Sequence, residues 1–150
     1  MWENKLIDWF FRAQAIGITG ASAAAGTGPA TLYIGLLTVA ATDVGGGTEV
    51  SGGSYARVAV TSSLANWAGT QGAGTTTASS GTTGTTSNNN ILTYAAPTAT
   101  WGLVVGYAAY DAASGGNPIF FGTLTSSRQI NSGDPASTFP AASLTFQMDN

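Results

Sequence analysis

The chain contains no cysteine and no histidine among its 150 residues. Without cysteine it has no disulfide, no thiolate nucleophile and no cysteine-ligated metal. Without histidine it also lacks the residue that most often serves as general base and as transition-metal ligand. These two absences exclude most common hydrolase and metal-site chemistries. We therefore predict a protein that is not an enzyme, with no catalytic residue, no cofactor and no metal site.

Charged residues are also scarce. Seven acidic and four basic residues make up 7% of the chain and give a net charge of −3, whereas ordinary soluble domains contain about 25% charged residues. The four cations lie far apart in the sequence, at Lys5, Arg12, Arg57 and Arg128. No basic stripe therefore exists to neutralise phosphates, and nucleic-acid binding is not expected. No apolar run reaches the roughly 18 residues of a membrane span, and the acidic residues near the start are unlike a signal peptide, so we expect no membrane association.

Residues 2–16 carry the only strong helical pattern of the chain. At 100° per residue its large apolar side chains fall on one broad arc, while Asp8 and Arg12, spaced to pair at i,i+4, fall on the opposite side, where we expect water. The arc is wider than a single contact requires. The helix therefore either packs across the chain's own sheet or docks on a neighbouring subunit. The residues expected in such a subunit contact are Trp2, Leu6, Trp9 and Phe10.

Beyond this helix, the pattern changes to short strands. Residues 17–30 form a linker of small residues, and segments of alternating apolar residues then recur between glycine-rich turns. Seven or eight short strands with one N-terminal amphipathic helix predict a mainly β fold, either an antiparallel sandwich or a jelly-roll-like barrel. A chain of this length suits one domain, which we place at residues 31–150.

Residues 69–90 interrupt the β pattern. This segment contains only Gly, Thr, Ser, Asn, Ala and one Gln. It buries too little apolar surface to offset an ordering entropy of about 1 to 2 kcal/mol per residue. We therefore predict that its order comes from a neighbouring subunit, through extended, β-branched threonines. The threonines expected at that interface are Thr75, Thr76, Thr82 and Thr83.

Few residues are available for chemistry or ligand binding. Two carboxylate pairs, Asp43 with Glu49 and Asp111 with Asp134, could in principle serve a glycosidase, but each carboxylate lies in or beside a glycine turn, where a structural role is the better interpretation. Glu49 and Arg57 flank the turn at 51–54, and we predict that they form a structural pair across a hairpin.

Aromatic residues are the remaining candidates for a glycan-binding platform. In the segment 100–110 the alternation predicts that Trp101, Leu103 and Tyr107 face the core. Tyr94 and Tyr110 are the members expected to be exposed. A glycan is therefore compatible with the sequence but not favoured.

Several segments resemble a family of small proteins of tailed bacteriophages, labelled tail-fibre-like or virion proteins. The likeness covers most of the chain, and its most specific part is Thr-Glu-Val-Ser-Gly-Gly-Ser-Tyr-Ala-Arg at 48–57. The other matching segments are 32–38, Trp101-Gly102 and 111–117. The resemblance implies a structural component of the virion, made in the bacterial host cytoplasm, with phage capsid or tail proteins as partners.

Within that class the leading hypothesis is a capsid decoration, or cement, protein that bridges neighbouring capsid subunits, with a homotrimer as the favoured assembly. The first alternative is a tail or fibre-attachment component. From other classes, the alternatives are a carbohydrate-binding module and, more remotely, a glycosidase. A cement protein would bury its helix or its loop against another chain, whereas a glycosidase would need two carboxylates about 5 to 9.5 Å apart in one cleft.

Overall fold

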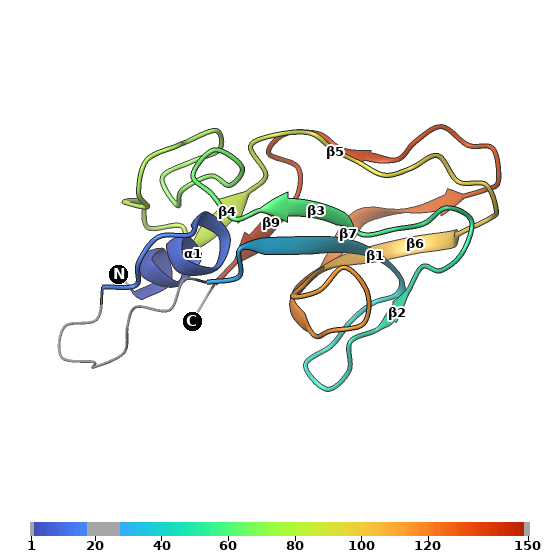
Figure 1. The fold of residues 1–150 in the computed structure, drawn as a ribbon, viewed down its shortest axis with the longest axis horizontal. Helices are drawn as coiled ribbons and strands as arrows, with labels where there is room; N and C mark the ends of the chain where they lie inside the picture. Colours follow the sequence, from blue (N-terminus) through green and yellow to red (C-terminus); the bar gives the residue numbers. More distant parts are fainter. Residues whose placement is uncertain (1, 18–27, 149–150) are drawn as a thin grey trace. The chain divides into compact units, whose positions relative to one another are not determined.

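The computed structural model describes residues 2–17 and 28–148, which contain one helix and nine strands (Figure 1). The chain divides into two compact units. The first contains residues 1–31, 61–91 and 140–150, and the second contains residues 32–60 and 92–139. The linker expected at 17–30 falls mostly on residues 18–27, which lie outside the described residues.

The first unit is built on α1 (Trp2–Arg12), with β4 (Thr85–Ser87) paired antiparallel to β9 (Thr145–Gln147). The helix ends at Arg12 rather than near residue 16, because Ala13 adopts a left-handed conformation with φ of 53° and Gln14 N–H donates to the Asp8 carbonyl. The core of this unit is aromatic: the Phe11 ring lies 4.9 Å from Trp67 and 5.2 Å from Phe146.

The buried side of α1 differs from the one that its periodicity indicates. Its buried residues are Ile7, Asp8, Phe11 and Arg12. The water-facing position expected for Asp8 and Arg12 is therefore wrong, although their pairing is confirmed at 2.6 Å. A periodicity analysis places charged side chains outside by default, since burying them is costly unless they are paired and hydrogen-bonded.

Most of the second unit is an antiparallel sheet in the order β2-β1-β6-β7, with β3 also pairing with β1. These strands are β1 (Thr31–Val39), β2 (Thr48–Glu49), β3 (Val58–Thr61), β6 (Gly102–Tyr110) and β7 (Pro118–Ile130). A separate antiparallel ribbon joins β5 (Leu92–Thr93) to β8 (Thr138–Phe139). The mainly β, antiparallel fold with one N-terminal helix is thus confirmed.

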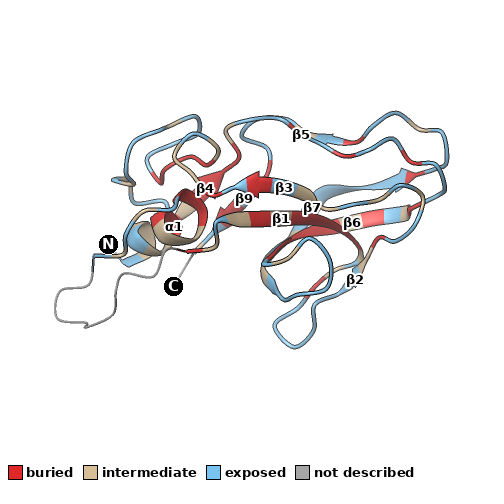
Figure 2. Ribbon diagram, viewed as in Figure 1, coloured by how far each residue is buried: buried red, intermediate tan, exposed pale blue. Residues whose placement is uncertain are grey.

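Burial is concentrated in β1 and β6, whereas β7 is exposed along most of its length (Figure 2). The predicted core face of residues 100–110 is only partly correct: Trp101 and Tyr107 are buried, but Leu103 is 48% exposed and Val104 is buried. The β6–β7 register shifts between Val104 and Gly106, and this irregularity interrupts the alternation on which the prediction rested.

Candidate functional site

The segment that carries the phage resemblance folds as a tight turn between β2 and β3. Gly52, Gly53 and Ser54 have φ values of 75°, 55° and 64°, in the left-handed region that favours glycine. The Gly53 carbonyl accepts a hydrogen bond of 3.0 Å from Trp101 Nε1. A Cβ at Gly53 would lie 2.8 Å from Ala99 N. The two glycines are therefore needed for the backbone conformation and for close packing.

This turn brings Arg57 against Glu49 in a two-pronged ion pair. Arg57 Nε donates to Glu49 Oε1 at 2.8 Å, and Nη2 donates to Oε2 at 2.7 Å. Nη1 donates to the carbonyls of Ala112 and Gly115, and the guanidinium lies 3.4 Å from the ring centre of Tyr110. Its hydrogen bonds with Glu49 raise the pKa of Arg57. The pair predicted from the sequence is present, and it also holds the 111–117 turn.

The hydroxyl of Tyr55 completes the cluster. It accepts from Leu36 N–H at 2.7 Å and donates to Glu49 Oε1 at 2.8 Å, and burial raises the pKa of Tyr55. Gly35 lies against the cluster, because a Cβ there would be 2.7 Å from Glu49 Oε1 and 2.9 Å from the Tyr110 ring. A hollow of about 390 Å³ adjoins Glu49 and Arg57. The polar groups of this cluster are engaged with one another, which is the arrangement of a structural clamp.

Two of the other candidate carboxylates, Asp111 and Asp134, also hold turns. Asp111 accepts hydrogen bonds from Asn117 N at 2.7 Å and from Asn117 Nδ2 at 3.1 Å, and these bonds lower the pKa of Asp111. Asp134 Oδ2 accepts from Asn131 N at 2.8 Å. Asp43 is exposed. Where these carboxylates have partners, the partners are amides of their own turns.

The aromatic platform considered for glycan binding does not form as expected. Tyr94 and Tyr110, predicted to be exposed, are both buried. Tyr94 lies among Tyr55, Trp101 and Phe139 in the core of the second unit, and its hydroxyl donates to the Ile34 carbonyl at 3.1 Å. Single-strand alternation missed this burial because a second layer, the β5–β8 ribbon, contributes Phe139.

In the first unit, a buried ionic network connects α1 to the loop at 69–90. Arg12 is 0% exposed and donates to Asp8, to Ser79 Oγ and to three backbone carbonyls, those of Trp67, Thr75 and Thr77. Asp8 in turn accepts from Ser79 N at 2.8 Å and from Ser79 Oγ at 2.6 Å. The guanidinium therefore adds donors to the Thr75 and Thr77 carbonyls of the loop, which also accept from Asn89 and Gln71.

Asn4 adds a second connection from the same helix. Its Nδ2 donates to the Gly81 carbonyl at 3.0 Å, and its Oδ1 accepts from Thr70 Oγ1 at 2.8 Å. The prediction that order in this loop comes from outside the fold is wrong, because helix side chains of the same chain form hydrogen bonds with it. The spacing Asn4-Asp8-Arg12, one polar residue per helical turn, is the signal in the sequence that could have indicated this face.

The residues predicted for a subunit interface have different environments. Trp2 is 60% exposed, whereas Leu6, Trp9 and Phe10 are half-buried. Thr75 Oγ1 donates to the Gly72 carbonyl and Thr83 Oγ1 to the Thr70 carbonyl, so both hydroxyls are used within the loop. Thr76 and Thr82 are exposed. Whether any of them contacts another chain stays a prediction.

Comparison with known families matches residues 1–147, almost the whole chain, and places the protein among the structural proteins of bacteriophage virions. The matching family is Gp80, described as the podophage GP4 fiber I protein gp80, and the chain belongs to this family. No curated protein matches the chain. The protein is thus a virion component that associates with other virion proteins. Among the described residues, no helix is both long and apolar enough to cross a membrane.

Proposed function

We propose that the chain is a non-catalytic subunit of the virion fibre. In this proposal it attaches to other virion proteins through the part of α1 that carries Trp2, away from the Asp8–Arg12 side. The family's description as a fibre protein supports this placement. The observation that carries the attachment is the position of Trp2. The Asp8–Arg12 side of the helix is fixed to its own loop, while Trp2 is 60% exposed at the other end of the helix. Exposed tryptophans are enriched among the residues that dominate protein interfaces.

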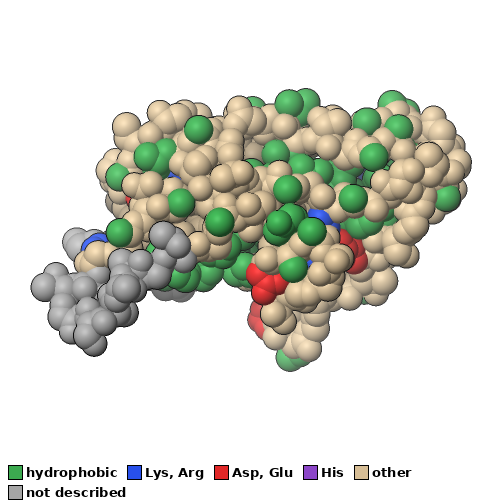
Figure 3. All heavy atoms as spheres, viewed as in Figure 1, with side chains coloured by type: hydrophobic (Ala, Val, Ile, Leu, Met, Phe, Trp, Pro, Cys, Tyr) green, Lys and Arg blue, Asp and Glu red, His purple; other side chains and the backbone are tan. Residues whose placement is uncertain are grey.

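The absence of catalysis is part of the same proposal. Glu49 is paired with Arg57, and Asp111 and Asp134 hold turns, so these carboxylates serve the fold. Charged side chains are also sparse on the face drawn in Figure 3, which is mostly uncharged and polar with scattered hydrophobic side chains. Such a surface repels neighbouring copies weakly, as suits a protein packed in many copies.

Capsid decoration is the second candidate. A cement protein that bridges neighbouring capsid subunits needs two contact elements, and the helix and the loop at 69–90 would supply them. In this arrangement Leu6, Trp9 and Phe10 border the helix contact, the loop contributes Thr75, Thr76, Thr82 and Thr83, and the assembly is a homotrimer. Electron cryomicroscopy of particles that carry a tagged copy separates the candidates, because extra density on the fibre supports the first and extra density on the capsid lattice supports the second.

The helix contact is tested with Trp2→Ser and a matched control, Val44→Ser, which removes another exposed apolar side chain, 98% exposed. An interface tryptophan contributes about 2 kcal/mol or more, so we expect incorporation of Trp2→Ser into virions to fall at least tenfold. Val44→Ser should be incorporated as the unaltered chain is. Equal incorporation of both variants would contradict attachment through Trp2.

The loop contact is tested by introducing charge where the fold does not need the threonine. Thr76 and Thr82 are exposed, so Thr76→Lys with Thr82→Lys should leave the monomer folded, and Thr42→Lys at another exposed position is the control. We expect sedimentation to show a smaller assembly only for the loop variant. An unchanged assembly in that variant would remove the loop from the interface.

A further inference from the structure

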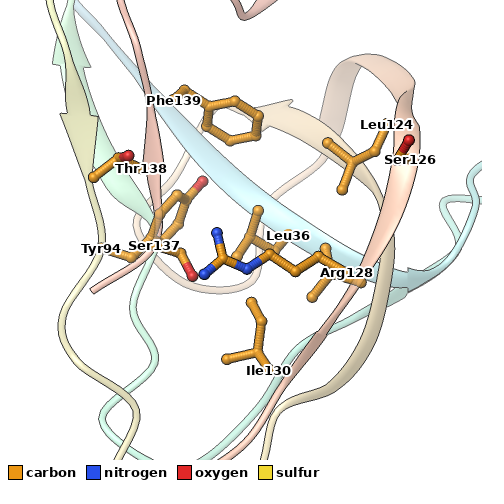
Figure 4. Close-up of a pocket in the computed structure, with 10 residues that line it drawn as sticks. Leu36, Tyr94, Leu124, Ser126, Arg128, Ile130, Ser137, Thr138 and Phe139 are labelled. Carbon is orange, nitrogen blue, oxygen red and sulfur yellow. The ribbon is translucent and has the colours of Figure 1, made fainter. Parts of the chain in front are cut away.

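The second unit contains a pocket of about 200 Å³ that the structural clamp does not use (Figure 4). Leu36, Val104 and Ile130 form its inner wall, and all three belong to the buried core. Phe139 and Leu124 lie on one side of the pocket, and Arg128 extends across it toward Ser137. The lining is mostly apolar, with Arg128 and a few hydroxyl groups as its polar members.

A bulge in β7 accounts for the pocket. Val104 pairs with Arg128 and Gly106 pairs with Thr123. The chain therefore advances two residues in β6 but five residues in β7 between these two pairs. The extra residues of β7, around Leu124 and Ser126, cannot all pair with β6, and the strand bends at this point. Bulges of this kind are frequent beside binding sites, where they redirect side chains.

One buried polar atom in the pocket has no partner. Ser137 is 8% exposed, and within the described part of the chain no group forms a hydrogen bond with its Oγ. A buried hydroxyl without a partner destabilises a fold, so such groups call for an explanation. A ligand that accepts or donates a hydrogen bond at this position would supply the missing partner.

The one charged side chain at the pocket, Arg128, is exposed and has no protein partner among the described residues. All four cations of the chain lie in the described residues. The side chains of Lys5, Arg12 and Arg57 bind carbonyls or carboxylates of the fold. No such partner is found there for the side chain of Arg128, which lines the pocket with the unpaired Ser137. Two donors thus lie at one apolar cavity, a combination suited to an anionic acceptor on an apolar group.

We propose that this pocket binds a single aromatic ring that carries a carboxylate, with the ring against Leu36, Val104 and Ile130 and the carboxylate between Arg128 and Ser137. The size supports one ring, since an apolar protein cavity of about 150 Å³ is known to hold benzene. A sugar suits it less, because its many hydroxyls would face an apolar wall without partners. The same chemistry has two sources, a free arylalkanoate, in which a short chain joins the ring to the carboxylate, and an aromatic residue at the carboxyl terminus of another virion protein.

The test is a titration of the full chain followed by NMR of its methyl groups. The probes are 3-phenylpropionate, its neutral primary amide, and an acetylated tetrapeptide that ends in phenylalanine with a free carboxylate. We expect saturable shifts at Leu36, Val104 and Ile130, with the amide bound about tenfold more weakly than the acid, because a hydrogen bond to a charged group exceeds the 1.4 kcal/mol that corresponds to tenfold. Tighter binding of the tetrapeptide than of 3-phenylpropionate identifies a chain terminus as the source, and the reverse order identifies a free acid.

Variants separate the two donors. Arg128→Gln should weaken 3-phenylpropionate about tenfold, whereas Lys5→Gln, which removes one positive charge elsewhere, should bind as the unaltered chain does. Ser137→Ala should weaken binding a few-fold and leave the chain at least as stable, because the hydroxyl has no partner to lose. The proposal fails if no methyl shift saturates, if the shifts lie outside the pocket, if acid and amide bind equally, or if Arg128→Gln binds like Lys5→Gln. Each of these outcomes leaves fibre attachment through Trp2 intact.

Discussion

Replacing Arg12 with methionine tests whether the helix orders the loop at 69–90. The substitution keeps a long apolar side chain but removes every donor of the guanidinium. Asp8, 8% exposed, is then left as a buried carboxylate with only the two hydrogen bonds from Ser79. The Trp67 carbonyl loses the donor given for it at the same time, and the carbonyls of Thr75 and Thr77 each lose one of two donors.

The magnitude follows from this geometry. Breaking a buried ion pair by removing one partner costs about 3 to 5 kcal/mol, because the remaining charge stays buried. We expect a value near the upper end, since the Trp67 carbonyl belongs to a fully buried residue and also loses a hydrogen bond. Domains are stable by only about 5 to 15 kcal/mol, so the variant should lose a large part of its stability.

The assay is urea denaturation followed by tryptophan fluorescence, combined with amide exchange of residues 70–80. Lys5→Met is the matched control, because it removes a positive charge from an exposed position of the same helix and should change stability by no more than about 0.5 kcal/mol. The double variant Asp8→Leu with Arg12→Met should be more stable than Arg12→Met alone, since no buried charge remains. The reasoning is refuted if Arg12→Met loses less than about 1 kcal/mol, or if exchange in the loop is unchanged.

Three further outcomes are expected in the second unit. Glu49→Gln should lower the free energy of unfolding by about 1 to 3 kcal/mol, because Arg57 loses its charged acceptor, and assays for glycan hydrolysis should show no turnover to lose. Asp111 has a lowered pKa, so its stabilising effect on the 111–117 turn should be present above about pH 4 and be lost as the pH falls through the lowered pKa. Amide exchange of Asn117 should report this loss. In Asp111→Asn the protection of the Asn117 amide should no longer change over this pH range. Burial raises the pKa of Tyr55, Tyr94 and Tyr110. Their contribution to stability should therefore be complete below about pH 10 and be lost at higher pH. The absorbance of tyrosinate should appear together with unfolding and not before it.

The sequence by itself determined the class of fold. Alternating apolar residues between glycine turns require strands, and the 100° periodicity of the first residues requires a helix, because both patterns follow from local backbone geometry. The Glu49–Arg57 pair was also predictable, since the two opposite charges flank a glycine turn and a hairpin brings such residues side by side. The resemblance at 48–57 likewise identified the virion class that the family match confirms.

Only the tertiary structure decided which charges are buried and which polar segments are ordered. Asp8 and Arg12 resemble a water-facing pair in the sequence, but their burial depends on loop partners that lie more than 60 residues away in the chain. The pocket at Ser137 likewise depends on extra residues in β7 whose effect is fixed by pairing with β6. Periodicity predicts which side of a single element faces the core, on the assumption that charged and polar residues face water. These two sites depend instead on hydrogen-bonding and packing partners from distant elements, which a local pattern does not contain.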